Sequence, residues 1–224
     1  MAETYLLLKL LHIVLFVYWL GGDLGTFYAS RFVAREGHSA EQRLTALKIM
    51  MGVDQGPRIC MALILGPGIQ MAYNTGLMPI PAWAMVATWL ICLYWLAMVL
   101  AIHFGHDKSY LPLLTRIDFS FRLLVIVACL YFAVQSLLGD KSLILMDYLA
   151  WKLIIFAALV ACGLGIRMAL KPFGQAFMTM LQQGPNPQVD SVINGCLARA
   201  RPFVYLIWLG LLLNTALGMH LINP

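Results

Sequence analysis

Charged side chains are scarce in this sequence. Only 11% of the 224 residues are Asp, Glu, Lys or Arg, whereas about a quarter of a soluble domain is charged. Hydrophobic residues make up 62% of the chain. This composition excludes an ordinary soluble domain and predicts an integral membrane protein that contacts membrane lipid.

The sequence also lacks the short motifs of several enzyme classes. It has no GxSxG, P-loop, HExxH or dinucleotide-binding fingerprint. The five Cys form no CxxC pair, and we interpret them as small buried hydrophobes. No basic region precedes the long first apolar stretch, so we do not expect a cleaved signal peptide. The net charge of +5 comes from basic residues in short loops, which indicates orientation in a membrane and no binding of nucleic acid.

Long apolar stretches predict an all-α fold, a polytopic membrane bundle of six transmembrane helices in a single domain, 1–224. Each stretch is near the roughly 20 residues that a bilayer requires. Gly66-Pro67-Gly68 predicts a kink in the second span. The six expected spans are about 5–30, 58–76, 82–104, 121–139, 146–168 and 202–221.

Basic residues gather in alternate connections between these spans. The stretch 73–82 has no charge, and 139–147 has one Lys against two Asp, whereas the other connections are rich in Arg and Lys. The positive-inside rule therefore predicts basic loops in the cytoplasm and both termini outside. Within the basic loops, Ser39 and Gln42 form a capping-box pattern before a short amphipathic helix. Asn186 is a candidate cap for a helix after the break at 182–188.

A weak repeat suggests related helix hairpins. An Arg opens each outward-going span, and a side-chain amide follows about 18–20 Å along the helix. One interpretation is snorkelling Arg side chains with amides that pack between helices. The other is duplication, with guanidinium groups that suit carboxylates such as haem propionates or an anionic lipid. The pairs are Arg58 with Gln70, Arg122 with Gln135, and Arg201 with Asn214.

The first apolar stretch carries polar groups on one side. At 100° per residue, His12, Trp19 and Asp23 fall within about 40° of one another. Ionisable groups at membrane depth usually face a partner, a cavity or a cofactor. We expect Asp23 to form an ion pair with Arg58 or Arg201, or to act as a proton relay. The Gly21-Gly22-x-x-Gly25 cluster predicts a close approach by another helix.

His12 is the strongest candidate ligand. A neutral imidazole in an apolar helix suits haem iron, and the alternative is a buried His bonded to a neighbouring helix. Lys152 is expected at a similar depth, either snorkelling to the outer surface or facing a carboxylate as a catalytic cation. His220 is expected at the outer end. His103 is a candidate second haem ligand at the inner end, and the neighbouring His106 is expected to be solvated.

The stretch LLLKLLHIVLFVYWLGGDLGTFYASRFV resembles the first helix of a loose group of bacterial inner-membrane proteins. The group comprises HemJ-type protoporphyrinogen oxidases, CopD copper-resistance proteins and the membrane domain of cytochrome-linked urate oxidases. The residues that carry the resemblance are Lys9, His12, Trp19, Gly21-Gly22 and Arg31, together with Trp151-Lys152-Leu153 in a later helix. The resemblance implies roles in haem binding and activity for His12 and Lys152. HemJ-type proteins are shorter, with about four spans, and the other two groups are longer.

Together these patterns predict a bacterial inner-membrane protein with b-type haem in the outer half of its bundle. His12 would be an axial ligand, Phe16 and Trp19 would contact the macrocycle, and Lys152 would lie near a propionate or substrate carboxylate. The function would be electron transfer with quinone or a membrane redox partner, or tetrapyrrole oxidation by a haem-dependent oxidoreductase. The alternatives are a transporter of a small solute or ion, and an assembly subunit of a larger homo- or hetero-oligomer. Further candidates for cofactor binding are His103, His220 and Arg58.

Overall fold

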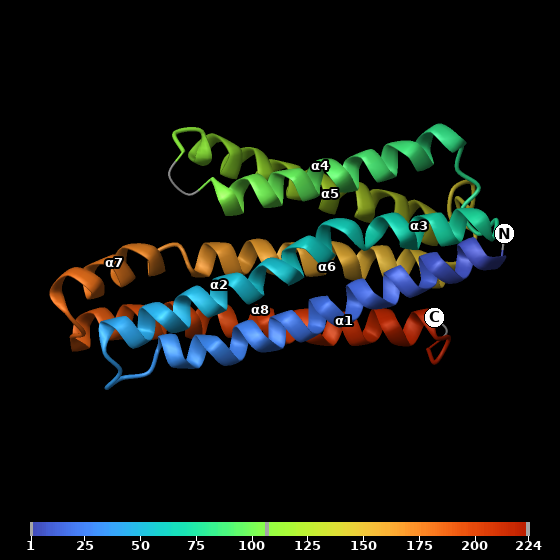
Figure 1. Cartoon of the computed structure of the whole chain (residues 1–224). Helices are drawn as coiled ribbons and strands as arrows, with labels where there is room; N and C mark the ends of the chain where they lie inside the picture. The colour runs from blue at the N-terminus through green and yellow to red at the C-terminus, as the bar shows by residue number, and fades with distance from the viewer. Residues whose placement is uncertain (1, 106–107, 223–224) are drawn as a thin grey trace.

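The computed structural model describes residues 2–105 and 108–222, and within these ranges it contains eight helices and no strand (Figure 1). The chain is therefore all-helical, as the sequence predicts. The helices are α1 (Ala2–Val33), α2 (Ala40–Leu63), α3 (Leu65–Asn74), α4 (Ala82–Phe104), α5 (Leu111–Leu137), α6 (Asp147–Ala169), α7 (Phe173–Gln183) and α8 (Pro187–Gly218).

The long helices lie side by side in an elongated bundle. Helix α1 packs along α2 and α3, α6 packs against α5 and α8, and α4 packs against α2 and α5. Helix α1 begins and α8 ends at the same end of the bundle, which we call the terminal end (Figure 1). At the opposite end, which we call the basic end, α1 connects to α2 and α7 connects to α8 (Figure 1).

Five helical segments are long and apolar enough to cross a membrane. They are Ala2–Val33, Ala82–Phe104, Leu111–Leu137, Asp147–Gln183 and Pro187–Gly218. Large apolar side chains such as Leu10, Leu90, Leu124 and Leu209 point outward and are more than half exposed. In a membrane such side chains would face lipid tails, so the chain is a multi-pass membrane protein.

The second expected span is interrupted. Helix α2 ends at Leu63 and α3 begins at Leu65, and Pro67 explains the break because its nitrogen cannot donate to the Leu63 carbonyl. The interruption therefore lies close to the predicted kink. The amphipathic segment after Ser39 does not form a separate helix, since α2 runs without a stop through Pro57. The capping box itself is present, with both Ser39–Gln42 hydrogen bonds formed.

Other helices extend beyond the expected spans at the basic end. Helix α8 begins at Pro187, where the Asn186 side chain accepts a hydrogen bond from the Val189 N–H, so the predicted cap is present. The span expected at 202–221 therefore forms only the second part of a longer helix. Helix α5 likewise begins at Leu111, ten residues before 121. Apolar runs mark where a helix meets lipid, but hydrogen bonding lets the helix continue into the polar region.

Two glycines of α1 let α2 approach closely. A Cβ atom on Gly22 would lie 2.5 Å from Cδ of Pro57, and a Cβ on Gly25 would lie 3.0 Å from Cγ1 of Val53. Gly21 has open space within 4 Å of the same position. The close approach predicted from the glycine cluster is thus made through Gly22 and Gly25.

We expect Gly22→Leu to destabilise the bundle by about 1–3 kcal/mol, because the added side chain would force α1 away from the Pro57 ring. Gly21→Leu is the matched control, since it adds the same side chain on the open side of α1. Unfolding by SDS in mixed micelles, followed by circular dichroism, measures both variants. An equal loss of stability in the two would contradict the packing described here.

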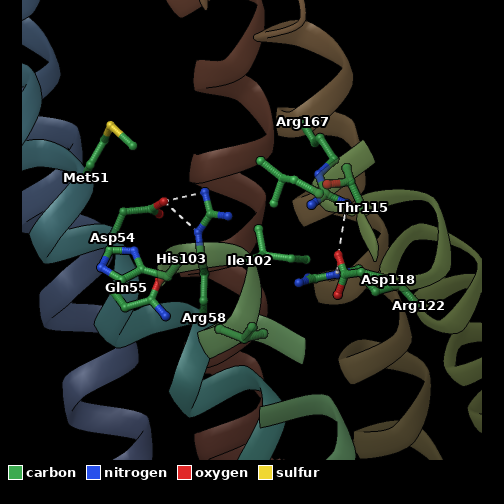
Figure 2. A pocket seen from close by; sticks show the side chains of 12 residues that line it. Met51, Asp54, Gln55, Arg58, Ile102, His103, Thr115, Asp118, Arg122 and Arg167 are labelled. Carbon is green, nitrogen blue, oxygen red and sulfur yellow. Dashed lines mark hydrogen bonds and ion pairs between the residues drawn. The ribbon is translucent and has the colours of Figure 1, made fainter. Parts of the chain in front are cut away.

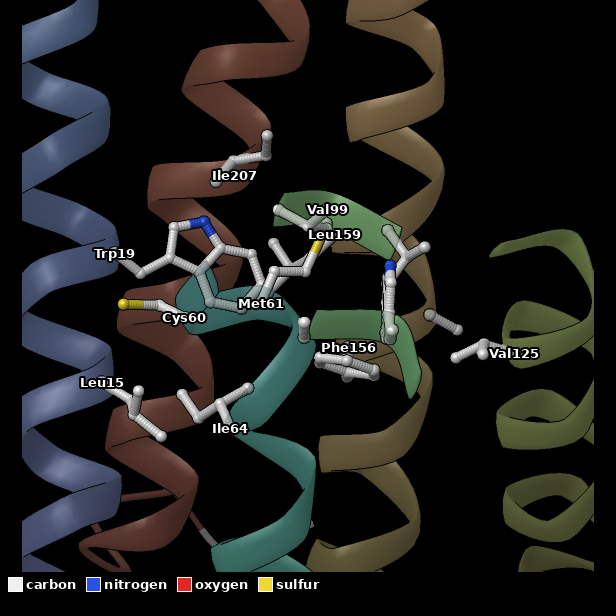
Figure 3. Packing of buried hydrophobic residues seen from close by; sticks show 14 of the residues in the cluster. Leu15, Trp19, Cys60, Met61, Ile64, Val99, Val125, Phe156, Leu159 and Ile207 are labelled. Carbon is white, nitrogen blue, oxygen red and sulfur yellow. The ribbon is translucent and has the colours of Figure 1, made fainter. Parts of the chain in front are cut away.

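The central core joins α1, α2, α4, α5, α6 and α8. Figure 3 shows Trp19, Cys60, Met61, Ile64 and Phe156 in mutual packing at its centre. Cys60 and Cys129 lie in this core, and all five Cys are free thiols. The interpretation of the cysteines as small hydrophobes is confirmed for the four that are buried, whereas Cys162 is partly exposed.

Candidate functional site

His12 lies where α2 is broken. Its Nδ1 atom is 3.0 Å from the carbonyl oxygen of Ile64, the residue between α2 and α3. The ring also packs on Gly68, where an added Cβ would lie 3.1 Å from Cε1 of His12. A carbonyl oxygen only accepts hydrogen bonds, so Nδ1 must carry the proton. The neutral ring then keeps a free lone pair on Nε2, the atom that could bind a metal.

Lys152 is held against the end of α8. Its Nζ atom donates to the Asn214 carbonyl at 3.1 Å, and Asn214 Nδ2 donates back to the Lys152 carbonyl at 3.4 Å. A Cβ atom on Gly218 would lie 2.7 Å from Nζ, so the ammonium group occupies space that this glycine leaves open. A cation is favoured here because the last turn of a helix carries partial negative charge. His12, in the first part of α1, and Lys152, held against the last part of α8, both lie in the half of the bundle nearer the terminal end (Figure 1).

Trp19 and Phe16 belong to the central core. Trp19 is 3% exposed, and its ring meets the edge of Phe156 at a centroid distance of 6.4 Å. Phe16 is partly buried against the same cluster. The predicted face of α1 therefore points toward the bundle interior, but the ring of Trp19 is covered by other protein side chains.

The ion pair expected for Asp23 is not formed. Arg58 pairs instead with Asp54, one turn earlier in α2, at 2.5 Å, and Arg201 is exposed. Among the described residues, Oδ2 of Asp23 is buried and has no hydrogen-bond partner. The prediction was wrong because a carboxylate four residues before Arg58 on the same helix reaches it more easily than one on another helix.

A second polar region lies nearer the basic end. It is a pocket of about 180 Å³ between α2, α4, α5 and α6 (Figure 2). We call it the arginine pocket because three guanidinium groups line it. Its charged and titratable lining residues are Arg58, Arg122, Arg167, Asp54, Asp118 and His103.

Asp118 organises this pocket. Its side chain is fully buried, and Oδ2 accepts hydrogen bonds from Nε of Arg122 at 3.0 Å and from Nη1 of Arg167 at 2.9 Å. Arg122 is also 5.4 Å from the Trp95 ring centroid, a cation–π contact. Arg122 is thus packed inside the protein and does not snorkel to headgroups. Arg58 lines the same pocket, but Arg201 is exposed, so the three arginines of the weak repeat do not share one site.

Two amides of the weak repeat, those of Gln70 and Asn214, also lie at different sites. Gln70 accepts a hydrogen bond from the Trp89 indole at 3.1 Å, between α3 and α4, and Asn214 binds Lys152.

Our sequence reasoning did not single out Asp118, Asp54 or Arg167 as site residues. Two Asp-x-x-x-Arg patterns, at Asp54 and Asp118, were the available signal, because residues four apart on a helix face each other.

The other candidate histidines have contacts of their own. His103 lines the arginine pocket, and His220 packs on the Tyr148 ring at a centroid distance of 4.8 Å. His106 lies outside the described residues. Within the part of the chain that the structure describes, no three His, Cys, Asp or Glu side chains are grouped to hold a metal ion.

No protein-family model, curated protein or solved structure matches this chain.

Proposed function

We propose that the chain is a bacterial inner-membrane protein that binds b-type haem through Nε2 of His12 and acts in electron transfer or tetrapyrrole oxidation. The observation that carries the proposal is the bond between Nδ1 of His12 and the Ile64 carbonyl. Histidines that bind metals almost always donate their other ring N–H to such a partner, which fixes the tautomer and orients the ring. The resemblance of the first helix to haem-associated membrane proteins supports the same reading.

The proposal includes a topology. Helices α2 and α3 together run antiparallel to α1 and would form a sixth passage through the membrane (Figure 1). An even number of passages agrees with the start of α1 and the end of α8 at one end. The basic end would face the cytoplasm and both termini would lie outside. His12 and Lys152 would then occupy the outer half of the bundle.

The chain's own residues would supply ligation and electrostatics. One-electron redox chemistry would come from the haem, while the protein sets the ligand, the polarity and the nearby charge. The Lys152 ammonium would attract a propionate or a substrate carboxylate toward His12. Phe16, one turn from His12, is the aromatic candidate for macrocycle contact, whereas Trp19 would hold α1 against α6 through Phe156. Quinone or a membrane redox partner would exchange electrons at this layer, in a monomer or an oligomer.

The haem content of the purified protein tests this proposal. The chain would be expressed with ample 5-aminolaevulinate, purified in mild detergent and assayed as the pyridine haemochrome. We expect bound b-type haem in an amount comparable to the protein. Protein that folds and purifies without haem would overturn the proposal.

A small-solute transporter is the second candidate, and the break in α2 favours it. Broken helices in transporters expose backbone groups at membrane depth where solutes bind. Here the Ile64 carbonyl at the break meets His12. A colourless protein that catalyses solute uptake into vesicles would support this candidate over haem binding.

A further inference from the structure

The arginine pocket has the size of a small ligand site. Its volume of about 180 Å³ is below the roughly 300–1,000 Å³ of pockets for drug-sized molecules. It lies nearer the basic end than His12 does, and its lining residues do not include Ile64 or Gly68, against which the His12 ring lies. A ligand in it would therefore be small, and a macrocycle or a quinone would not fit.

The pocket carries more positive than negative charge. Three guanidinium groups face two carboxylates, since Asp118 is shared by Arg122 and Arg167 while Asp54 binds Arg58. The difference is one positive charge before His103 is considered. Several guanidinium groups around one space favour a bound group with negative charge there.

Donors converge on the pocket from three helices. Each guanidinium carries five N–H donors, and Arg122 and Arg167 each use only one of these for Asp118. Nε2 of Gln55 is buried and has no hydrogen-bond partner among the described residues. Figure 2 shows Gln55 on α2 beside Arg58, facing Asp118 and Arg122 of α5 across the pocket, with Arg167 of α6 at its edge.

We infer that the arginine pocket binds a phosphate group. A planar carboxylate is matched by two parallel donors from one guanidinium, whereas donors from α2, α5 and α6 surround a space and suit a tetrahedral oxyanion. The group would come either from free inorganic phosphate on the basic side or from the headgroup of an anionic lipid such as phosphatidylglycerol. This inference does not depend on haem, because it uses none of the residues around His12.

Thermal unfolding of the full chain tests the site, with inorganic phosphate as one probe and phosphatidylglycerol in mixed micelles as the other. A ligand that binds only the folded protein raises its melting temperature with concentration. Sodium chloride at matched ionic strength, and phosphatidylcholine, control for non-specific effects. We expect stabilisation of the wild type by at least one of the two phosphate probes, and the responding probe identifies the source.

Two variants locate the effect. Arg58→Gln removes a charge whose described ion pair lies within α2, and Gln55→Met removes the buried donor without changing the charge. Both should fold, and each should weaken the apparent affinity for the responding probe about tenfold. Arg116→Gln, an exposed arginine on α5, should bind as the wild type does. The inference is overturned if neither probe stabilises the wild type, or if Arg116→Gln weakens binding as much as Arg58→Gln.

Discussion

Arg43→Met should cost about 3–5 kcal/mol of folding stability, because it leaves a buried carboxylate without its partner. Arg43 is 0% exposed although it belongs to a basic stretch of the sequence. Its Nη1 atom donates to Oδ1 of Asp190 at 2.5 Å, and Nε donates to the Val33 carbonyl at 2.7 Å. One side chain therefore fastens the end of α1, the start of α2 and the start of α8 to one another.

Denaturation by SDS, followed by circular dichroism, measures this loss. Lys48→Met is the matched control, because Lys48 is exposed on the same helix and should change stability by less than about 0.5 kcal/mol. The double variant Arg43→Met with Asp190→Leu should recover most of the loss, since it leaves no charge buried. Equal effects of Arg43→Met and Lys48→Met would show that the pair does not hold the basic end together.

His12→Gly should remove most of the bound haem while the protein stays folded. The variant deletes the proposed iron ligand and leaves a space beside Gly68 in which free imidazole can bind. We therefore expect added imidazole to restore haem binding to His12→Gly. The measurement is the ratio of haem to protein after purification, with and without imidazole.

His38→Ala serves as the control for this experiment, because His38 lies at the basic end, in the connection between α1 and α2, where its ring stacks on Phe32. It should retain the haem content of the wild type. The proposed ligand would be incorrect if His12→Gly kept its haem, or if it lost haem and imidazole failed to restore it while circular dichroism showed an intact fold.

The sequence was sufficient for the helical class and most helix positions. Helix α4 has the expected bounds 82–104, since apolar residues fill it and Pro81 and Gly105 flank it. The helix capped by Asn186 was expected, but its continuity with the span at 202–221 was missed, because Arg199 and Arg201 interrupt the apolar run without ending the helix. A prediction from hydropathy ends a membrane span where charged residues begin. The helix itself ends only where its backbone hydrogen bonding ends or a cap terminates it.

The candidate sites were only partly predictable. Helical periodicity was sufficient to predict that His12 and Asp23 share one face of α1. Counting residues from the ends of the expected spans was sufficient to predict that His12 and Lys152 lie toward the same end of the bundle. The Arg43–Asp190 pair joins residues 147 positions apart, and no local pattern in either segment indicates the other. The sharing of Asp118 between Arg122 and Arg167 likewise depends on how α5 packs against α6. Such contacts follow from helix packing, which the periodicity of a single helix does not specify.

The reduced-minus-oxidised visible spectrum of the purified protein, recorded beside His12→Ala, tests the central claim most directly. We predict the α-band of a b-type haem in the wild type and its loss or shift in His12→Ala. An α-band of equal position and intensity in both proteins, or a wild type without absorbance in this region, would contradict haem ligation by His12.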